Sequence, residues 1–287
     1  MFVTVSDGFL KNVSPEPFTA LRMLGLDQVD VWLNRELATP SLVDKDGHPY
    51  DLSSPKGVGA LRKSLAANKV RACCLSLGTD FGRPDQEAET QWLVRACQLA
   101  DELGAPALRM DPATWSAKLP DEEMVRRIAA AVARALDESE TVALGAENHG
   151  PVANKQSFLD AMLEMTPSER FGLTLDCGNF YWFGNPLDHV YELVRRYAGR
   201  TRHTHVKNIA FPAETRQTQR EMGWRYGELC CPLPDGDIDL KRVVATLAKA
   251  GYKGALSIED ESLGRLSKED ASRELKRDVE HLKATLK

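Results

Sequence analysis

The chain has 287 residues, of which 43% are hydrophobic and 28% are charged. This is the composition of a globular protein with enough apolar side chains for a large core. The length suits a single α/β barrel, for which roughly 250 residues is typical. The formal net charge of -5 at pH 7 excludes a bulk attraction to nucleic acid or to anionic membranes, and the sequence holds no evident basic patch, so we expect neither as a partner.

The beginning of the chain, MFVTVSDGFL, lacks the basic region and the long apolar run of a secretory signal. No window approaches the roughly 18 consecutive apolar residues of a membrane-spanning helix. The six cysteines include no CxxC pair, which suits neither a disulfide framework nor a structural zinc site. These features predict a cytoplasmic protein with reduced thiols.

Apolar, β-branched segments alternate with amphipathic segments along the chain. The predicted strands, in chain order, are Phe2–Val5, Gln28–Leu33, Val70–Leu77, Ala107–Met110, Thr141–Glu147, Phe171–Asp176, Thr201–Lys207 and Gly254–Glu259. Strict alternation of strands and helices is typical of a parallel sheet covered by helices. Eight such units favour closure of the sheet, so the sequence predicts an α/β protein, a single (β/α)8 TIM barrel domain over residues 1–287.

The segments between these strands carry helix signals at their ends. Pro55 stands at a first helical position, and Gly104 closes the amphipathic run from Pro84 to Leu103. Further helices are predicted to begin at Pro120 and to cover Gln156–Glu164, Leu187–Tyr197, Leu240–Ala250 and Lys268–Thr285. The stretch Asn208–Asp237 shows no clear periodicity and is long for a connection in a barrel, which is typical of a lid, a binding loop or a disordered segment. Its arginines Arg216, Arg220 and Arg225 are expected to be solvated, with the binding of an anionic substrate as the alternative.

In a β/α barrel the active site lies where the strands end. Four consecutive predicted strands finish in Glu147, Asp176, His205 and Glu259. Removing unpaired carboxylates from water is costly, and one shared divalent cation would offset that cost. Three carboxylates and one imidazole suit Mn²⁺ or Mg²⁺, with Co²⁺, Fe²⁺ or Zn²⁺ also open, and four ligands leave room for substrate oxygens.

Each of these residues also has an ordinary structural interpretation. Asp176 alone could cap the following turn, and His205 alone could be a hydrogen-bonded core histidine, so the hypothesis depends on the coincidence of four strand ends. Strand alternation places His203, His205 and Lys207 on one face. His205 is nearer the mouth and is the preferred ligand, whereas His203 is predicted to lie one layer deeper as a hydrogen-bonded core residue.

Several other side chains follow the predicted ligands closely. The candidates for substrate binding are His149, Asn179, Lys207 and Glu261. The Lys207 ammonium could hold a substrate hydroxyl, carbonyl or phosphate.

Other side chains near the strand ends have either a purely structural interpretation or two interpretations that stay open. Arg109 and Asp111, at the end of the fourth strand, are interpreted as a structural ion pair. Trp32 is interpreted as a core residue or a pocket wall, and Trp182 and Trp224 could stack on a sugar ring or serve only in packing.

The segments around these strand ends resemble those of the sugar phosphate isomerase/epimerase superfamily, the xylose-isomerase-like TIM barrels. The matching stretches are Ala146–Gly150, Leu175–Asn179, His203–Asn208 and Leu256–Glu259, and the order of the strands extends the resemblance over nearly the whole chain. The resemblance implies that the four strand-end residues bind one metal ion, and that Glu147 and Glu259 are catalytic and move protons on either face of the substrate. The chain departs from the pattern at Asn179, where many relatives have His, and at Asn208, where an Asp often follows the lysine.

The resemblance implies a divalent-metal-dependent isomerase or epimerase that acts on a keto-sugar or related polyhydroxy carbonyl compound by α-proton abstraction through a metal-stabilised enediolate. The alternative is a metal-dependent lyase or dehydratase that performs β-elimination on a keto-sugar, a 3-keto-glycoside or an inosose. A DNA-repair endonuclease of related fold would need more histidines than the six present and a basic surface. A barrel that binds a sugar without turnover is the non-enzymatic alternative. Relatives often form dimers or tetramers, so a homo-oligomer is an open expectation, although no segment is identifiable as an interface.

Overall fold

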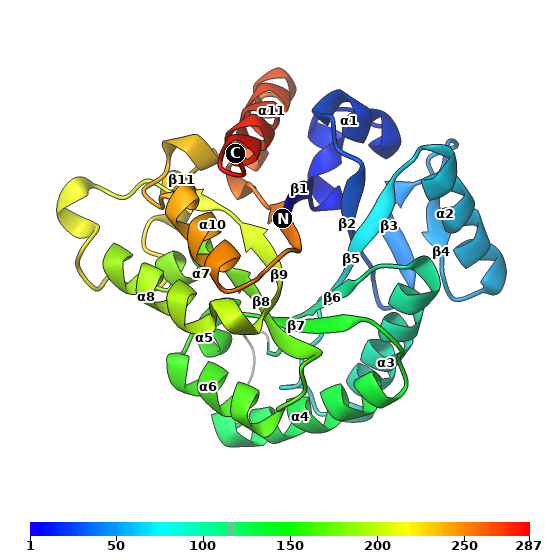
Figure 1. Ribbon diagram of the computed structural model, residues 1–287, viewed down its shortest axis with the longest axis horizontal. Helices are drawn as coiled ribbons and strands as arrows, with labels where there is room; N and C mark the ends of the chain where they lie inside the picture. The colour runs from blue at the N-terminus through cyan, green and yellow to red at the C-terminus, as the bar shows by residue number, and fades with distance from the viewer. Residues whose placement is uncertain (114, 116–117) are drawn as a thin grey trace.

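The computed structural model describes residues 1–113, 115 and 118–287. Eight parallel strands lie at the centre and helices surround them (Figure 1). Their order around the sheet is β1 (Phe2–Val5), β12 (Ala255–Ile258), β9 (Thr201–Val206), β8 (Phe171–Asp176), β7 (Ala143–Glu147), β6 (Ala107–Met110), β5 (Arg71–Leu77) and β2 (Gln28–Trp32). One parallel bridge between Ser6 and Asp30 joins the two outer strands, so the barrel is nearly closed. The structure confirms the predicted α/β barrel, and every predicted barrel strand is present.

The helices bury one face each against the barrel. In α4, for example, Met124, Ile128, Ala131 and Ala135 are buried at intervals of three or four residues, which is the spacing of one helix face. The surrounding helices are α1 (Pro17–Leu24), α2 (Pro55–Ala67), α3 (Gln86–Leu103), α4 (Asp121–Asp137), α6 (Gln156–Met165), α8 (Leu187–Tyr197), α10 (Leu240–Lys249) and α11 (Lys268–Ala284). Three short helices, α5 (Gly150–Ala153), α7 (Cys177–Trp182) and α9 (Tyr226–Leu229), lie in the loops that follow strands.

Two small antiparallel sheets were not predicted. Strands β3 (Ala38–Val43) and β4 (Pro49–Asp51) form a hairpin between β2 and α2, and β10 (Asn208–Ile209) pairs with β11 (Cys230–Cys231). The β10–β11 pair joins residues 208–209 to residues 230–231, and it thereby closes most of the long segment 208–237 into a loop. That segment is therefore organised by backbone pairing and not only by side chains.

Arg220 holds the same segment against α7, and its predicted solvation is wrong. The guanidinium donates to the carbonyl oxygens of Asn185 at 2.7 Å and Tyr181 at 3.3 Å. It also lies over the rings of Tyr181 and Phe211, at 4.6 and 4.2 Å from their centroids. Arg216 is only half-exposed and pairs with Asp237 at 2.9 Å. These contacts fix the segment as a wall beside the mouth of the barrel.

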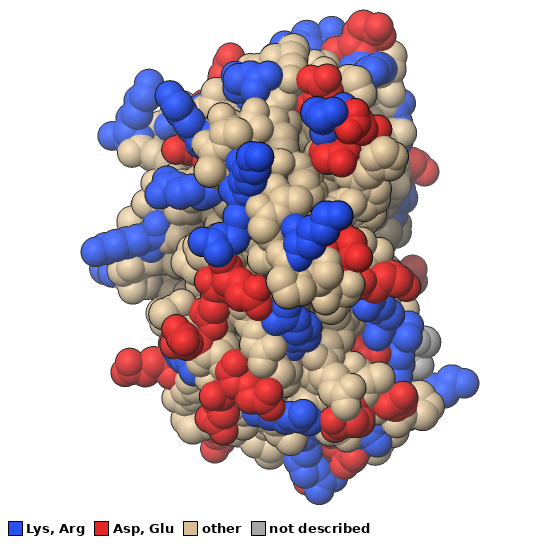
Figure 2. Space-filling model, turned by 90° about the vertical axis from the view of Figure 1, so that its right-hand side faces the viewer, with Lys and Arg blue, Asp and Glu red and all other residues tan. Residues whose placement is uncertain are grey.

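The outer surface carries charges of both signs. On the side shown in Figure 2, which is the right-hand side of Figure 1 where α2 and α3 lie, basic and acidic side chains are both spread over the surface. In the described part of the chain, no helix combines the length and the apolar character needed to cross a membrane.

Candidate metal centre

Four polar side chains converge at the carboxyl ends of the barrel strands. Glu147 ends β7, Asp176 ends β8, His205 lies in β9 and Glu259 follows β12. One ligand atom from each lies within 4.8 Å of the ligand atoms of the others. The parallel register explains the convergence, since Asp176 lies opposite His205 across β8 and β9. The structure thus brings the four predicted residues together, while their role as ligands stays a prediction.

Glu147 is buried among partners that favour its ionised form. Its Oε2 accepts a hydrogen bond from Arg109 Nε at 2.7 Å, and its Oε1 lies 3.0 Å from His205 Nδ1. Asn179 Nδ2 also donates to Oε1 over 3.2 Å. Burial raises the pKa of this carboxyl, but the charges of Arg109 and His205 outweigh burial and hold the pKa well below its usual range. Glu147 is therefore a carboxylate at neutral pH.

Asp176 has one oxygen without a hydrogen-bond donor. Its Oδ1 accepts the backbone N–H groups of Gly178 at 2.8 Å and Asn179 at 3.1 Å, so the helix-capping interpretation is correct for this oxygen. Its buried Oδ2 accepts no hydrogen bond and lies 3.3 Å from Lys207 Nζ. Burial raises the pKa of Asp176 to about 6, although Lys207 acts in the opposite direction. A buried carboxylate oxygen of this kind, beside other carboxylates, fits a cation site.

Lys207 lies among three carboxylates at the mouth. Its Nζ lies 2.8 Å from Glu261 Oε1, 2.9 Å from Glu259 Oε2 and 3.3 Å from Asp176 Oδ2. Burial lowers the pKa of Lys207, but these carboxylates outweigh burial and raise it well above its usual value. The side chain is therefore an ammonium group. Burial raises the pKa of Glu259, yet Lys207 and His205 together hold it below its usual value.

Arg109 joins two carboxylates of the site. It forms hydrogen bonds with Asp111 at 2.8 and 3.0 Å, which confirms the predicted ion pair, and it also binds Glu147 through both Nε and Nη2. Asp111 in turn lies 2.9 Å from His149 Nδ1. Desolvation lowers the pKa of His149, but the hydrogen bond to Asp111 and the charge of Glu147 raise it above its usual value. Arg109 thus belongs to the site, which the sequence did not indicate.

A cavity of about 370 Å³ lies beside the four converging residues, since Asn179 in its lining donates a hydrogen bond to Glu147. It is lined by Trp115, His149, Asn179, Trp182, Gly223, Tyr226 and Glu261. Three of the four residues predicted to bind substrate therefore line this cavity, and the fourth, Lys207, contacts Glu261. The rings of Trp115 and Trp182 meet edge to face with their centroids 5.1 Å apart. These aromatic walls offer apolar surface to a ring or a carbon chain.

The other two predicted aromatic candidates do not line this cavity. Trp224 packs against Phe211 with ring centroids 5.9 Å apart. Trp32 lies beneath the Arg109 guanidinium, at 6.0 Å from its ring centroid.

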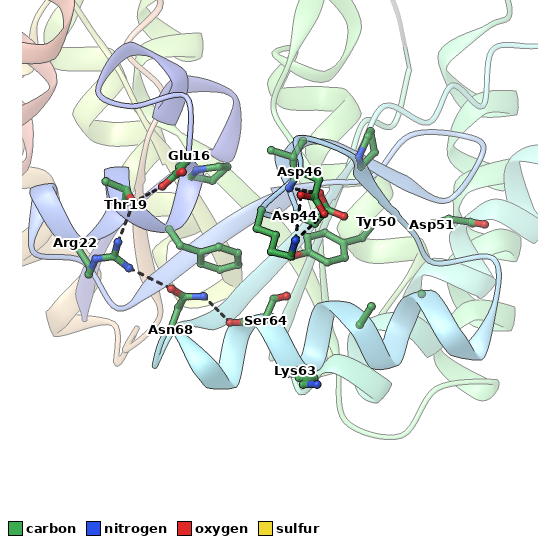
Figure 3. Close-up of a pocket in the computed structure, with 17 residues that line it drawn as sticks. Glu16, Thr19, Arg22, Asp44, Asp46, Tyr50, Asp51, Lys63, Ser64 and Asn68 are labelled. Carbon is green, nitrogen blue, oxygen red and sulfur yellow. Dashed lines mark hydrogen bonds and ion pairs between the residues drawn. The ribbon is translucent and has the colours of Figure 1, made fainter.

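A larger cavity of about 510 Å³ lies elsewhere, between α1, the β3–β4 hairpin and α2 (Figure 3). Its polar side chains pair with one another: Arg22 donates to Asn68 at 3.1 Å and to Thr19 at 2.8 Å, and Lys45 contacts Asp46 at 3.0 Å. No described residue that lines this cavity forms a hydrogen bond or ion pair with the four converging residues, whereas Asn179, in the lining of the smaller cavity, donates to Glu147. The smaller cavity is therefore the one next to the converging residues.

Asp30 is a residue of the site region that sequence reasoning missed. It lies in the middle of β2, is completely buried, and accepts hydrogen bonds from His203 Nε2 at 2.9 Å and His205 Nε2 at 3.1 Å. Burial raises its pKa, but the two histidines outweigh burial and hold the pKa well below its usual range. The contact confirms that His203 is a hydrogen-bonded core residue. The sequence feature that could have indicated a role for Asp30 is the presence of a charged residue between Val29 and Val31 in a strand.

Comparison with known proteins agrees with this architecture. The chain belongs to the xylose isomerase-like TIM barrel family, whose family model matches residues 18–285. An inosose dehydratase of Clostridium tetani is 32% identical over 108 residues, which cover 36% of this chain and 35% of that protein. The match thus spans about a third of the curated relative.

Two solved structures share the fold. The structure of the IolI protein with a bound zinc atom has a TM-score of 0.73, with 16% identity and 98% of each chain covered. D-psicose 3-epimerase of Clostridium cellulolyticum H10, solved with D-tagatose, has a TM-score of 0.68, with 12% identity and 100% of each chain covered.

Proposed function

We propose that this chain is a divalent-metal-dependent isomerase or epimerase of a keto-sugar or a related polyhydroxylated carbonyl compound. The observation that carries the proposal is the convergence of Glu147, Asp176, His205 and Glu259 within 4.8 Å. The two glutamates come from strand ends that are not neighbours in the sheet, so they can reach a bound substrate from different directions. The proposed partner is a small carbohydrate.

The donor set fits a divalent ion. Three carboxylates and one imidazole supply hard oxygen and nitrogen ligands, and Asp176 Oδ2 is a buried oxygen without a hydrogen-bond donor. An ion bound there would act as a Lewis acid that withdraws electrons from the substrate carbonyl. We favour Mn²⁺ or Mg²⁺ because oxygen ligands predominate, and the zinc-bound IolI structure supports Zn²⁺ as the alternative.

The two glutamates would transfer the proton. An ionised carboxylate breaks the C–H bond next to the carbonyl by taking the proton, and the electron pair moves toward the carbonyl oxygen. The second glutamate, after it takes a proton from water, gives that proton to the same carbon from another direction, which yields an epimer, and the first glutamate releases its proton to water. Delivery to the neighbouring carbon, with transfer of the hydroxyl proton to the former carbonyl oxygen, yields an isomer. Lys207, held as an ammonium group, would donate a hydrogen bond to a substrate oxygen. The aromatic walls of the cavity would exclude water.

A second candidate function is β-elimination by a lyase or dehydratase. The observation that favours it is the pair of His149 and Asp111, 2.9 Å apart, because elimination needs an acid to protonate the departing oxygen. His149 lines the cavity, and Asp111 raises its pKa. The matched inosose dehydratase supports the same candidate.

Solvent deuterium incorporation tests the proposal. The chain would be incubated in D₂O with Mn²⁺ and a panel of keto-sugars and inososes, with the Glu147→Gln, Glu259→Gln double variant as control. An epimerase or isomerase incorporates deuterium at carbon and forms a new stereocentre or a shifted carbonyl. A lyase forms an enone that absorbs ultraviolet light and releases the β-substituent. Absence of exchange at carbon across the panel, or equal exchange in the double variant, would contradict the proposed chemistry.

A further inference from the structure

Asp30 occupies a central position below the four converging residues. Its Oδ2 accepts hydrogen bonds from His203 Nε2 at 2.9 Å, Ser257 Oγ at 3.0 Å and His205 Nε2 at 3.1 Å. Its Oδ1 accepts a hydrogen bond from Ser76 Oγ at 2.7 Å. Both carboxylate oxygens are thus engaged by donors from β5, β9 and β12, and the side chain has no freedom to turn.

His205 is held between this carboxylate and the converging residues. Its Nε2 contacts Asp30, while its Nδ1 lies 3.0 Å from Glu147 Oε1 and 3.5 Å from Glu259 Oε2. A carboxylate has no proton to donate, so the hydrogen bond to Asp30 requires a proton on Nε2. The other nitrogen, Nδ1, faces the other proposed ligands, and a metal ion would bind there in place of the proton that Nδ1 shares with Glu147.

We propose that Asp30 is a positioning residue that fixes the ring orientation and the Nε2–H tautomer of His205, so that Nδ1 is the metal-binding atom. This inference rests on the proposed metal centre. Ligating histidines commonly donate their second ring N–H to a carboxylate, and loss of such a partner weakens metal binding about 10- to 100-fold. His203 and Ser257 hold Asp30 itself in place.

Irregularities in the sheet bring these residues together. The pairing of β2 with β5 shifts between Val29 and Asp30, and the pairing of β8 with β9 shifts between Leu173 and Thr174, just before His203. Such irregularities redirect side chains in barrels. Asp30 also forms the bridge to Ser6 at which the barrel closes. The position of Asp30 is therefore determined by the fold and not by a local loop.

A second metal ion at Asp30 is the competing explanation. Asp30, Cys74 and His203 also place ligand atoms within 4.8 Å of one another. However, both Asp30 oxygens already accept hydrogen bonds, and the Cys74 thiol donates to the carbonyl oxygen of Leu75 at 3.4 Å. Asp30 and Cys74 therefore already have hydrogen-bond partners without a metal ion. We therefore expect one metal ion per chain, not two.

The test compares Asp30→Asn with the wild type and with Glu89→Gln. Glu89 is the control, since it is a buried carboxylate of α3 that accepts hydrogen bonds from Arg35 and from the backbone N–H of Asp80, both at 2.9 Å. Calorimetric titration with Mn²⁺ measures affinity and stoichiometry. We expect one ion per wild-type chain, about 10- to 100-fold weaker binding in Asp30→Asn, and a small effect in Glu89→Gln. Equal affinity in wild type and Asp30→Asn, or two ions per wild-type chain, would overturn the proposal.

A second measurement does not depend on a metal ion. Nitrogen-15 NMR of the metal-free wild type should show a slowly exchanging proton on Nε2 of His205, and this signal should be lost in Asp30→Asn. A slowly exchanging proton on Nδ1 with rapid exchange at Nε2 would overturn the assigned orientation. If Asp30→Asn does not fold, Ser257→Ala removes one donor to Asp30 and should weaken Mn²⁺ binding less strongly; unchanged affinity would count against the proposal. If the wild type binds no metal but shows the Nε2 signal, the proposed function is contradicted. The hydrogen bond by which Asp30 orients His205 is then still supported.

Discussion

Arg109 donates its Nε–H to Oε2 of Glu147 across 2.7 Å, and both side chains are almost completely buried. The same guanidinium pairs with Asp111. Replacing Arg109 by methionine keeps much of the apolar volume but leaves two buried carboxylates without their cation. We expect the free energy of unfolding of the metal-free protein to fall by about 3 to 5 kcal/mol. Urea denaturation measures this loss, and added Mn²⁺ should restore part of it.

Arg134→Met is the matched control for this prediction. Arg134 pairs with Glu87 at 2.8 Å and Glu138 at 3.0 Å, but all three side chains are well exposed. Exposed ion pairs contribute little to stability because water screens them, so this variant should lose little stability. Equal losses in the two variants would show that Arg109 does not neutralise the site.

Metal affinity should rise with pH. Bound metal needs ionised Asp176, whose pKa burial raises to about 6, and neutral Nδ1 of His205, whose own pKa the surrounding carboxylates raise well above its usual value despite burial. Protons must therefore leave when the metal binds. Above about pH 6 one proton, from His205, makes the Mn²⁺ affinity rise tenfold per pH unit until that histidine has lost its proton. Below about pH 6 the second proton, from Asp176, makes the dependence steeper. Calorimetry in buffers of different ionisation enthalpy measures the protons released; release of none would contradict this prediction.

Lys207 should compete with the metal. Its ammonium group contacts Asp176 and Glu259, two of the proposed ligands. Lys207→Met should therefore destabilise the metal-free protein while it tightens Mn²⁺ binding by at least about tenfold, because a buried like charge is removed. Turnover of substrate should fall, because a hydrogen-bond donor to the substrate is lost. Thermal unfolding with and without Mn²⁺ gives the metal response, and a smaller response than in the wild type would contradict this competition.

His149→Gln separates the two candidate reactions. If the chain is a lyase, the variant should lose elimination by about 10²-fold or more, while exchange of the α-proton continues. If it is an epimerase, both exchange and epimerisation should persist with an altered KM. His189→Gln is the control, since His189 is an exposed histidine of α8 that contacts Glu192. The variant would be assayed for enone formation and deuterium uptake in the same samples. Parallel loss of both reactions would show that His149 takes part in proton abstraction itself.

The barrel and the converging residues were accessible from the sequence for a physical reason. Strands buried on both faces have continuous apolar patterns, and the carboxyl ends of parallel strands meet at one mouth. The polar residues Glu147, Asp176 and Glu259 at those ends could therefore be placed together without a structure.

Other features depend on tertiary contacts that no local pattern reveals. Asp30 meets His205 across 175 positions of sequence, where the barrel closes. The β3–β4 hairpin contains Pro40 and Pro49, which weaken a strand pattern. Arg220 packs on aromatic rings and donates to carbonyl groups in and after α7, so a charged residue of a polar segment is partly buried and holds that segment in place.

Crystals grown with Mn²⁺ and measured by anomalous scattering would test the central claim most directly. We predict one anomalous peak per chain, with Glu147, Asp176, His205 Nδ1 and Glu259 as ligands. A peak at another place, or none among these four side chains at saturating Mn²⁺, would contradict the account.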